Sequence, residues 1–224
     1  MDRMILPVRS VSGLLKLPGD KSISHRYAML GAIAEGLTKI HNYSSGSDCA
    51  STLACLQAMG VSVESRGTSV TIEGVGLSGL QEPVGPLDAG NSGSTIRMLS
   101  GILAGQTFET TITGDESLAR RPMRRIITPL ERMGATVEAD GEEFPPLRIR
   151  GGTLKPITYR LAVPSAQVKT AVLFAGLYAK GKTSVREPRP TRNHSEIALR
   201  EFGAKVTTET GTTSVDGCHA LAGQ

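Results

Sequence analysis

Apolar and polar residues follow a pattern along the chain that occurs three times. Each copy begins with a helix-like stretch of small apolar residues that ends at a glycine. These stretches cover residues 27–36, 97–105 and 170–181. A polar loop and a second amphipathic stretch follow, and these end at Gly60, Gly134 and Gly203. Because glycine just past an apolar periodic run is typical of a helix C-terminus, the pattern predicts two helices in each copy.

Short stretches with a two-residue period lie between the predicted helices. The stretches "TVEAD" at 136–140 and "KVTTET" at 205–210 alternate apolar and polar residues, as half-buried strands do. Residues 69–74 and 146–152 would be the return strands of hairpins. The apolar run "SGLLKL" at 12–17, just before the first helix, is also predicted as a strand.

Each copy is therefore a βαβαββ unit of about 70 residues. A unit of this size buries too little apolar surface by itself, so we expect three units to pack together with pseudo-threefold symmetry in an α/β fold. We place the units at residues 13–79, 80–152 and 153–217, with 1–12 as a separate segment and 218–224 as a tail.

Composition narrows the class of protein. The 224 residues are 39% hydrophobic and 21% charged, as in a globular protein with a substantial core. The net charge of +4 suits an anionic partner without identifying it. Cys49, Cys55 and Cys218 form no pair or cluster with metal-ligand spacing, so we expect free thiols and no bound metal. With no secretory pattern and no apolar run near ~18 residues, we expect a cytoplasmic protein without a membrane partner.

The first helix of each copy begins with small, polar or cationic residues. These entrances read "GDKSISHR" at 19–26, "DAGNSGSTIR" at 88–97 and "VPSAQVK" at 163–169. A helix N-terminus attracts anions, because its first N–H groups are unpaired and carry a partial positive charge. Capping explains one Ser or Asn per helix, but not Lys21 and Arg26 together with two serines. If the units pack symmetrically, the entrances converge on a small, multiply anionic ligand.

Two polar loops add more cations. The loop "GDESLARRPMRRI" at 114–126 has four arginines, and Arg121 lies directly before a proline, where a restricted backbone suits a bidentate grip on carboxylate or phosphate. The loop "EPRPTRNHSE" at 187–196 offers Arg189 and Arg192. Aromatic residues for base stacking do not interleave these arginines, so we expect no nucleic-acid partner.

Five of these stretches resemble one enzyme family in motif and order. "LPGDKSISHR", "GNSGSTIRML", "GDESLARRPM", "PSAQVKTAVLFAG" and "TRNHSE" are similar to motifs of 5-enolpyruvylshikimate-3-phosphate synthases, over essentially the whole chain. The resemblance implies transfer of the enolpyruvyl group of phosphoenolpyruvate to the 5-hydroxyl of shikimate 3-phosphate, with release of phosphate and no cofactor. It also implies one lobe of the enolpyruvyl transferase fold, half of an inside-out α/β barrel.

The resemblance implies roles for individual residues. Those that would contact shikimate 3-phosphate are Lys21, Ser22, Arg26, Ser165, Ala166, Gln167 and Arg192. Those that would contact phosphoenolpyruvate are Lys21, Asn91, Gly93, Ser94, Arg121 and Gln167. Lys21, which faces both substrates, would be the catalytic residue of this lobe.

In the family, a second lobe supplies the acid and base groups and further cations. The sequence stops after the third unit, so we expect an N-terminal lobe whose partner is a complementary C-terminal lobe. Alone it would bind substrate weakly at most and turn over negligibly. Residues 1–12 would belong structurally to the other lobe.

Two other functions stay open. The sister family that transfers enolpyruvyl to UDP-N-acetylglucosamine has a Lys-Asn pair at the first entrance and a cysteine in the loop before "RP". This chain has Lys21 and Ser22 there, and no cysteine in that loop. A non-catalytic domain that binds phosphorylated metabolites is the second alternative. Activity that returns on addition of a C-terminal lobe would separate it from the enzyme.

Overall fold

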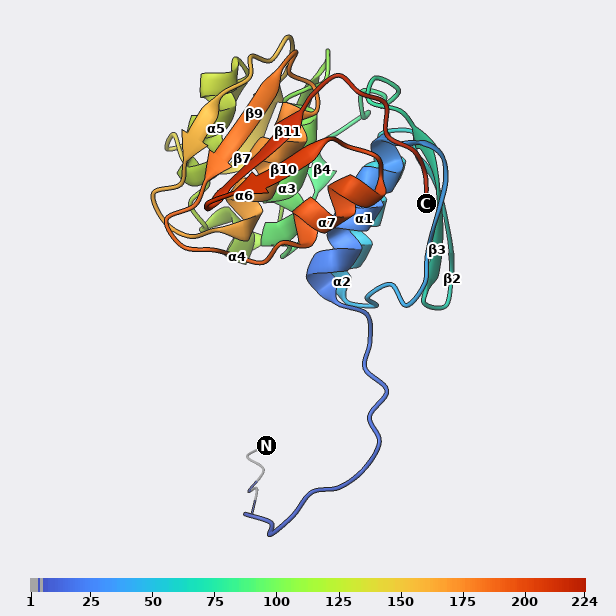
Figure 1. Ribbon diagram of the computed structural model, residues 1–224. Helices are drawn as coiled ribbons and strands as arrows, with labels where there is room; N and C mark the ends of the chain where they lie inside the picture. The colour runs from blue at the N-terminus through green and yellow to red at the C-terminus, as the bar shows by residue number, and fades with distance from the viewer. Residues whose placement is uncertain (1–3, 5) are drawn as a thin grey trace.

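The computed structural model describes residue 4 and residues 6–224, so the predicted segment 1–12 lies partly outside the described residues. Helices and strands alternate along the chain from Lys21 onward (Figure 1). The helices are α1 (Lys21–Ile33), α2 (Ser47–Ala58), α3 (Gly93–Leu103), α4 (Glu116–Ala119), α5 (Arg124–Met133), α6 (Ala166–Gly176) and α7 (His194–Glu201).

The strands form three separate sheets. The first has the order β1 (Glu35–Ile40), β3 (Ser69–Val75), β2 (Ser62–Arg66). The second has the order β4 (Leu87–Asp88), β5 (Glu109–Thr113), β7 (Phe144–Arg150), β6 (Thr136–Asp140). The third has the order β8 (Thr158–Arg160), β9 (Lys182–Arg186), β11 (Thr212–Asp216), β10 (Val206–Glu209). The mixed α/β class expected from the sequence is confirmed.

The second and third sheets share one strand order. In each sheet, a short first strand pairs in parallel with the next strand, β4 with β5 and β8 with β9. That next strand pairs antiparallel with the last strand of a hairpin, β6–β7 or β10–β11. The hairpin between β10 and β11 turns at Thr210 and Gly211, whose φ angles are 42° and 74°. Two successive positive φ angles fit the two-residue turns that match the twist of paired strands.

The prediction of a strand at 12–17 is wrong. These residues run as an unpaired extended segment away from the body (Figure 1), with Leu14 100% and Leu15 84% exposed. A strand needs an edge to pair with, and the corresponding edge of β1 is already occupied. The C-terminal tail holds it through parallel bonds, in which Glu35 N–H donates to Leu221 O and Gly223 N–H to Glu35 O, both at 2.8 Å.

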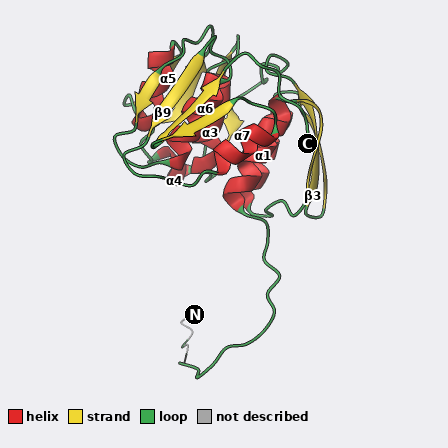
Figure 2. Cartoon of the chain, in the orientation of Figure 1, coloured by secondary structure: helices red, strands yellow, loops and turns green. Residues whose placement is uncertain are grey.

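Helices fill the centre and the sheets lie outside them (Figure 2). Apolar residues of α1, α3 and α6 are almost entirely buried, as the predicted small-residue helices require. Helices α3 and α6 can pack closely because residue 101 is glycine. A Cβ at this position would collide with the backbone carbonyl of Ala171. The three helices that open the predicted units therefore pack together in one core.

Each of these three helices is capped by a side chain at the predicted entrance. Asp20 accepts a bond from Ile23 N–H at 2.8 Å, Ser92 from Thr95 N–H at 3.1 Å, and Ser165 from Val168 N–H at 3.3 Å. The capping interpretation thus holds for one residue per helix, as expected for such side chains. The remaining polar groups of the entrances need another explanation.

Candidate functional site

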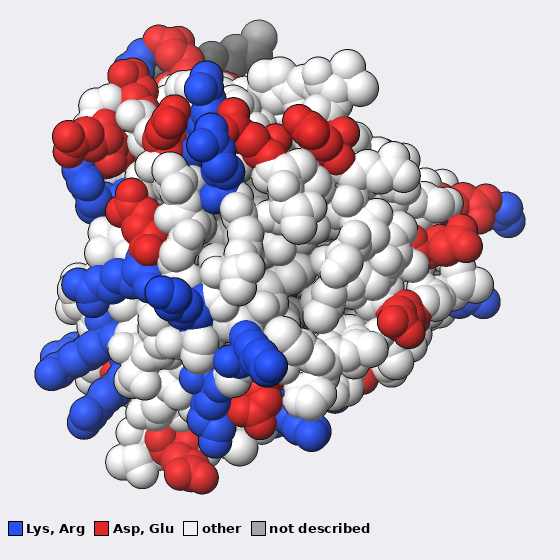
Figure 3. Space-filling model, turned by 90° about the horizontal axis from the view of Figure 1, so that it is seen from above, with Lys and Arg blue, Asp and Glu red and all other residues white. Residues whose placement is uncertain are grey.

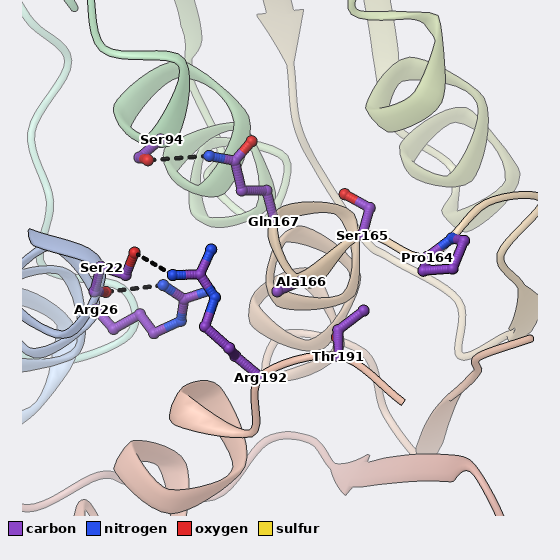
Figure 4. A pocket seen from close by; sticks show the side chains of 9 residues that line it. All are labelled: Ser22, Arg26, Ser94, Pro164, Ser165, Ala166, Gln167, Thr191 and Arg192. Atoms are coloured by element: carbon purple, nitrogen blue, oxygen red, sulfur yellow. Dashed lines mark hydrogen bonds between the residues drawn. The ribbon is translucent and has the colours of Figure 1, made fainter. Parts of the chain in front are cut away.

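A pocket of about 390 Å³ lies where the N-terminal ends of α1 and α6 meet the start of α3 and the loop before α7 (Figure 4). Seven of the predicted site residues line it: Ser22, Arg26, Ser94, Ser165, Ala166, Gln167 and Arg192. Pro164 and Thr191 line it as well and were not predicted. All three helix entrances therefore contribute to one cavity.

Arg26 is the most deeply placed cation of this pocket, with only 3% of its surface exposed. Its Nε donates to Ser195 Oγ at 2.7 Å, its Nη1 to the Ser22 carbonyl at 2.7 Å, and its Nη2 to Thr170 Oγ1 at 2.9 Å. These acceptors are neutral, so they fix the guanidinium without cancelling its charge. Burial, and then repulsion from Arg192, lower the pKa of Arg26 to about 10, which leaves it cationic at neutral pH.

Arg192 adds a second guanidinium beside the first. It comes from the loop before α7, and its Nη1 donates to Ser22 Oγ at 3.3 Å. Figure 4 shows both arginines converging on Ser22, with Gln167 and Ser94 on the opposite side of the pocket. Among the residues that the structure describes, no carboxylate lines this pocket. Two cations without an acidic partner in the cavity favour an anionic ligand.

Gln167 is held at the boundary between α3 and α6. Its Nε2 donates to Ser94 Oγ at 2.9 Å, and its Oε1 accepts from Arg97 Nη1 at 3.1 Å. Arg97 was not predicted as a site residue, although it closes the entrance motif "GNSGSTIR". Its place one helical turn after Gly93 was the available signal, because residues four apart share a helix face. A Cβ at Gly93 would lie 2.5 Å from Arg97 Nη1, so a side chain at this position would displace the Arg97 guanidinium.

Three arginines gather on this side of the pocket. Burial lowers the pKa of Arg97, and the neighbouring charges of Arg125 and then Arg121 lower it further. Arg97 Nε is buried and has no hydrogen-bond partner within the described part of the chain. Mutual repulsion and an unpaired donor both indicate that the region favours a negatively charged group.

The remaining predicted residues lie outside the pocket lining; Gly93 is buried, whereas Lys21, Asn91 and Arg121 lie near the surface. Lys21 Nζ forms an ion pair with Asp48 Oδ2 at 2.7 Å, and the lysine side chain is 54% exposed. Arg121 Nη2 donates to Asn91 Oδ1 at 2.6 Å, and Asn91 Nδ2 donates to Asp115 Oδ2 at 2.7 Å. The bonds from Asn91 and from the Leu118 N–H lower the pKa of Asp115. Local partners therefore engage these cations already.

Sequence reasoning also missed a buried polar layer under the entrances. His25 is fully buried, and its Nδ1 lies 2.7 Å from Thr52 Oγ1. Thr52 Oγ1 lies 2.7 Å from Thr95 Oγ1, and Thr95 Oγ1 donates to Ser92 Oγ at 2.7 Å. Burial lowers the pKa of His25 to about 4, so the imidazole is neutral at pH 7. The layer joins α1, α2 and α3 beneath the polar entrances.

Within residue 4 and residues 6–224, no group of three His, Cys, Asp or Glu side chains is arranged to hold a metal ion. None of the helices in that part of the chain has the length and apolar character needed to cross a bilayer. On the face drawn in Figure 3, basic and acidic side chains both occur and broad areas carry neither. Basic side chains gather in the lower left of that view, where acidic side chains are few.

Comparison with known proteins decides the family. The sequence profile of EPSP synthase (3-phosphoshikimate 1-carboxyvinyltransferase) matches residues 5–224. The chain belongs to the EPSP synthase family. A relative from Solibacter usitatus, named 3-phosphoshikimate 1-carboxyvinyltransferase, is 58% identical over all of this chain and 53% of its own length. A Thermoanaerobacter relative with the same name is 52% identical over 92% of this chain and 48% of its own length.

Solved structures of the family agree with the fold. An EPSP synthase from Acinetobacter baumannii superposes with a TM-score of 0.91 and 49% identity, over 94% of this chain and 48% of that one. The chain thus spans about half the length of the curated relatives it matches. The resemblance to 5-enolpyruvylshikimate-3-phosphate synthases stated from the motifs is confirmed at the level of the family.

Proposed function

We propose that this chain forms the shikimate 3-phosphate half of an enolpyruvyl transfer site, in which phosphoenolpyruvate donates its enolpyruvyl group to the 5-hydroxyl and phosphate is released. The observation that carries the proposal is the pocket with two guanidinium groups, Arg26 and Arg192, and no lining carboxylate among the described residues. The activity named for the relatives of about twice the length supports it.

The phosphate of shikimate 3-phosphate would lie at the N-terminus of α6. The first N–H groups of a helix are free to bind an anion, and α6 begins at Ala166 inside the pocket. The Ser165 hydroxyl and the Arg192 guanidinium would add bonds to the phosphate oxygens. Ser22, Arg26 and Gln167 would then face the ring and its hydroxyl groups, with Lys21 at the rim.

Phosphoenolpyruvate would bind beside this pocket. Asn91 is exposed beside the buried Gly93 and Ser94, and Arg121 lies against it, with its Nη1 donating to the Asn91 carbonyl at 3.4 Å. Lys21 is the catalytic residue of this proposal, because a cation at the rim would stabilise charge that develops as phosphate leaves. Gln167 would contact both substrates. Groups that move the reaction's protons would come from a second lobe.

A complementary C-terminal lobe is the partner that we propose. The chain matches only about half of each relative, which leaves room for a lobe of similar size. The extended N-terminal segment supports this partner, because Leu14, Leu15 and Leu17 are each more than two-thirds exposed and pair with nothing described. Such apolar surface on an unpaired strand-like segment is typical of a contact with another domain.

The test is phosphate release from shikimate 3-phosphate and phosphoenolpyruvate. The chain alone is expected to release no phosphate above background, whereas mixing it with the C-terminal half of the Solibacter relative should restore turnover. Arg26→Lys in the mixture is the control that ties activity to this pocket. Turnover by the chain alone would contradict the proposal that a C-terminal lobe is required. Binding of shikimate 3-phosphate without any restored turnover would favour a non-catalytic metabolite-binding domain.

A further inference from the structure

A buried ion cluster lies directly beneath the pocket. Lys169, in the first turns of α6, is only 1% exposed in its side chain. Its Nζ donates to Glu187 Oε2 at 2.9 Å and to Glu196 Oε1 at 2.6 Å, and the two carboxylates are 7% and 4% exposed. A lysine is rarely buried this deeply unless it is paired with charged groups, and here two carboxylates face it.

The three members come from three different elements. Lys169 is one turn below Ser165, whose carbonyl accepts the Lys169 N–H at 3.0 Å. Glu187 directly follows β9, and Glu196 lies in α7. The cluster therefore ties the floor of the α6 entrance to both ends of the loop that runs from 187 to 193. That loop contributes Thr191 and Arg192 to the pocket.

Contacts continue from the cluster to the pocket lining. The Thr191 hydroxyl donates to the second oxygen of Glu187. Next to Glu196, Ser195 Oγ accepts from Arg26 Nε and lies 2.5 Å from Thr170 Oγ1, the acceptor of Arg26 Nη2. Both arginines of the pocket are thus one or two contacts away from Lys169.

The cluster also has one more acidic group than basic groups. Two carboxylates face one ammonium group, and Glu196 Oε2 has no hydrogen-bond partner among the described residues. The negative charge of Glu196 acts on Arg26 and favours its cationic form. An arrangement built only for stability would not need the second carboxylate, because replacing buried ion pairs with apolar residues is often neutral or stabilising.

We propose that Lys169 and Glu187 are positioning residues, which hold the loop 187–193 so that Thr191 and Arg192 face the N-terminus of α6. We infer from the contacts described above that this loop is held in one conformation. Only the ligand used to read out the pocket, shikimate 3-phosphate, rests on the proposed function. Neither residue touches the pocket cavity, so each acts through Thr191 and Arg192.

The experiment uses Glu187→Ala in the full chain. This change keeps Lys169 paired with Glu196 in a charge-balanced buried pair, so the fold should survive. Amide hydrogen exchange at residues 189 and 191–193 and the Arg192 Nε–H resonance are measured with and without shikimate 3-phosphate. We expect exchange in the loop to become at least tenfold faster, with an unchanged rate in α3. Affinity for shikimate 3-phosphate should fall about tenfold.

Two further variants make the result specific. Glu209→Ala removes an exposed carboxylate from the same sheet and should change neither loop exchange nor affinity. Glu187→Gln keeps a hydrogen-bond acceptor of the same shape and should rescue much of the lost loop protection, and it is the variant to use if Glu187→Ala fails to fold.

The outcomes separate the two proposals. Loop exchange in Glu187→Ala equal to that of the unmodified chain would overturn the positioning role, whether or not ligand binds. Faster loop exchange with no binding of shikimate 3-phosphate by any variant, the unmodified chain included, would support the positioning role and count against the proposed function instead.

Discussion

The two anion-binding regions of this chain are built in different ways. The pocket around Arg26 and Arg192 rests on contacts between residues far apart in sequence, such as Arg26 with Ser195 and Thr170. The region around Lys21 and Arg121 is shallower, and its cations pair with neighbouring surface groups, Asp48 and Asn91. The first region is held in place within this chain, whereas the second has cations whose partners a ligand or another lobe could replace.

This difference has an energetic consequence. A buried guanidinium held by neutral acceptors keeps its charge available and loses little side-chain freedom when a ligand binds. An exposed lysine in an ion pair must first give up that pair, and exposed pairs contribute only about 0–1 kcal/mol. We therefore expect the pocket to bind its ligand weakly in this chain by itself, and the exposed region to need further groups.

The variant Arg26→Lys should give the largest effect and tests the difference between the two regions most strongly. Lysine keeps the charge but cannot make three fixed bonds, so affinity for shikimate 3-phosphate should fall about 100-fold. Isothermal titration calorimetry on the folded variant measures the loss. Arg66→Lys is the matched control, because Arg66 is exposed, lies outside the pocket and pairs with Glu64. Equal affinity of Arg26→Lys and the unmodified chain would show that the buried arginine is not part of the binding site.

The buried layer beneath the pocket predicts a specific acid sensitivity. The folded-state pKa of His25 is about 4, against 6.5 for an exposed histidine. Between these values the unfolded chain takes up a proton that the folded chain does not, so stability falls as pH decreases below 6.5. From pH 7 to pH 5, protonation of His25 in the unfolded chain should lower the free energy of unfolding by about 2 kcal/mol.

Urea unfolding at both pH values is measured for the unmodified chain and for His25→Asn, which cannot titrate. The difference between their losses of unfolding free energy is the contribution of His25. Thr52→Val is the control, since it removes the bond to His25 but leaves the buried imidazole, and so should keep the acid slope. If His25→Asn and the unmodified chain lose stability in parallel, the burial of a neutral histidine does not explain the slope.

The smallest effect is expected at the exposed cation. Lys21→Met should weaken shikimate 3-phosphate binding by this chain only about threefold, because the lysine is exposed and already paired with Asp48. Calorimetry under the conditions used for Arg26→Lys gives the comparison directly. A loss as large as that of Arg26→Lys would mean that the two regions form one continuous site in this chain.

Much of this architecture could be predicted from the sequence because its signals are local. Glycine stops and capping residues gave the three opening helices, and β6 coincides with the predicted stretch 136–140. The polar entrances contain six of the seven predicted lining residues, Arg192 lies in the loop 187–196, and the resemblance to the family implied their roles. The helix and strand predictions depend on periodicity and on helix-end chemistry, both of which act over a few residues.

What could not be predicted depends on long-range contacts. The run at 12–17 has a strand-like pattern, but the C-terminal residues Leu221 and Gly223 occupy the edge it would need. Thr191 opens the motif "TRNHSE", but its place in the pocket depends on its bond to Glu187, which no local pattern shows. The buried state of Lys169 is invisible in a sequence, since its two partners are 18 and 27 residues away.

An NMR titration of the unmodified chain, first with shikimate 3-phosphate and then separately with phosphoenolpyruvate, tests the central claim most directly. The account predicts saturable amide shifts at Ser22, Ala166 and Arg192 with shikimate 3-phosphate, and only weak, unsaturated shifts near Lys21 and Arg121 with phosphoenolpyruvate. Unchanged spectra with shikimate 3-phosphate, or tighter binding of phosphoenolpyruvate than of shikimate 3-phosphate, would contradict it.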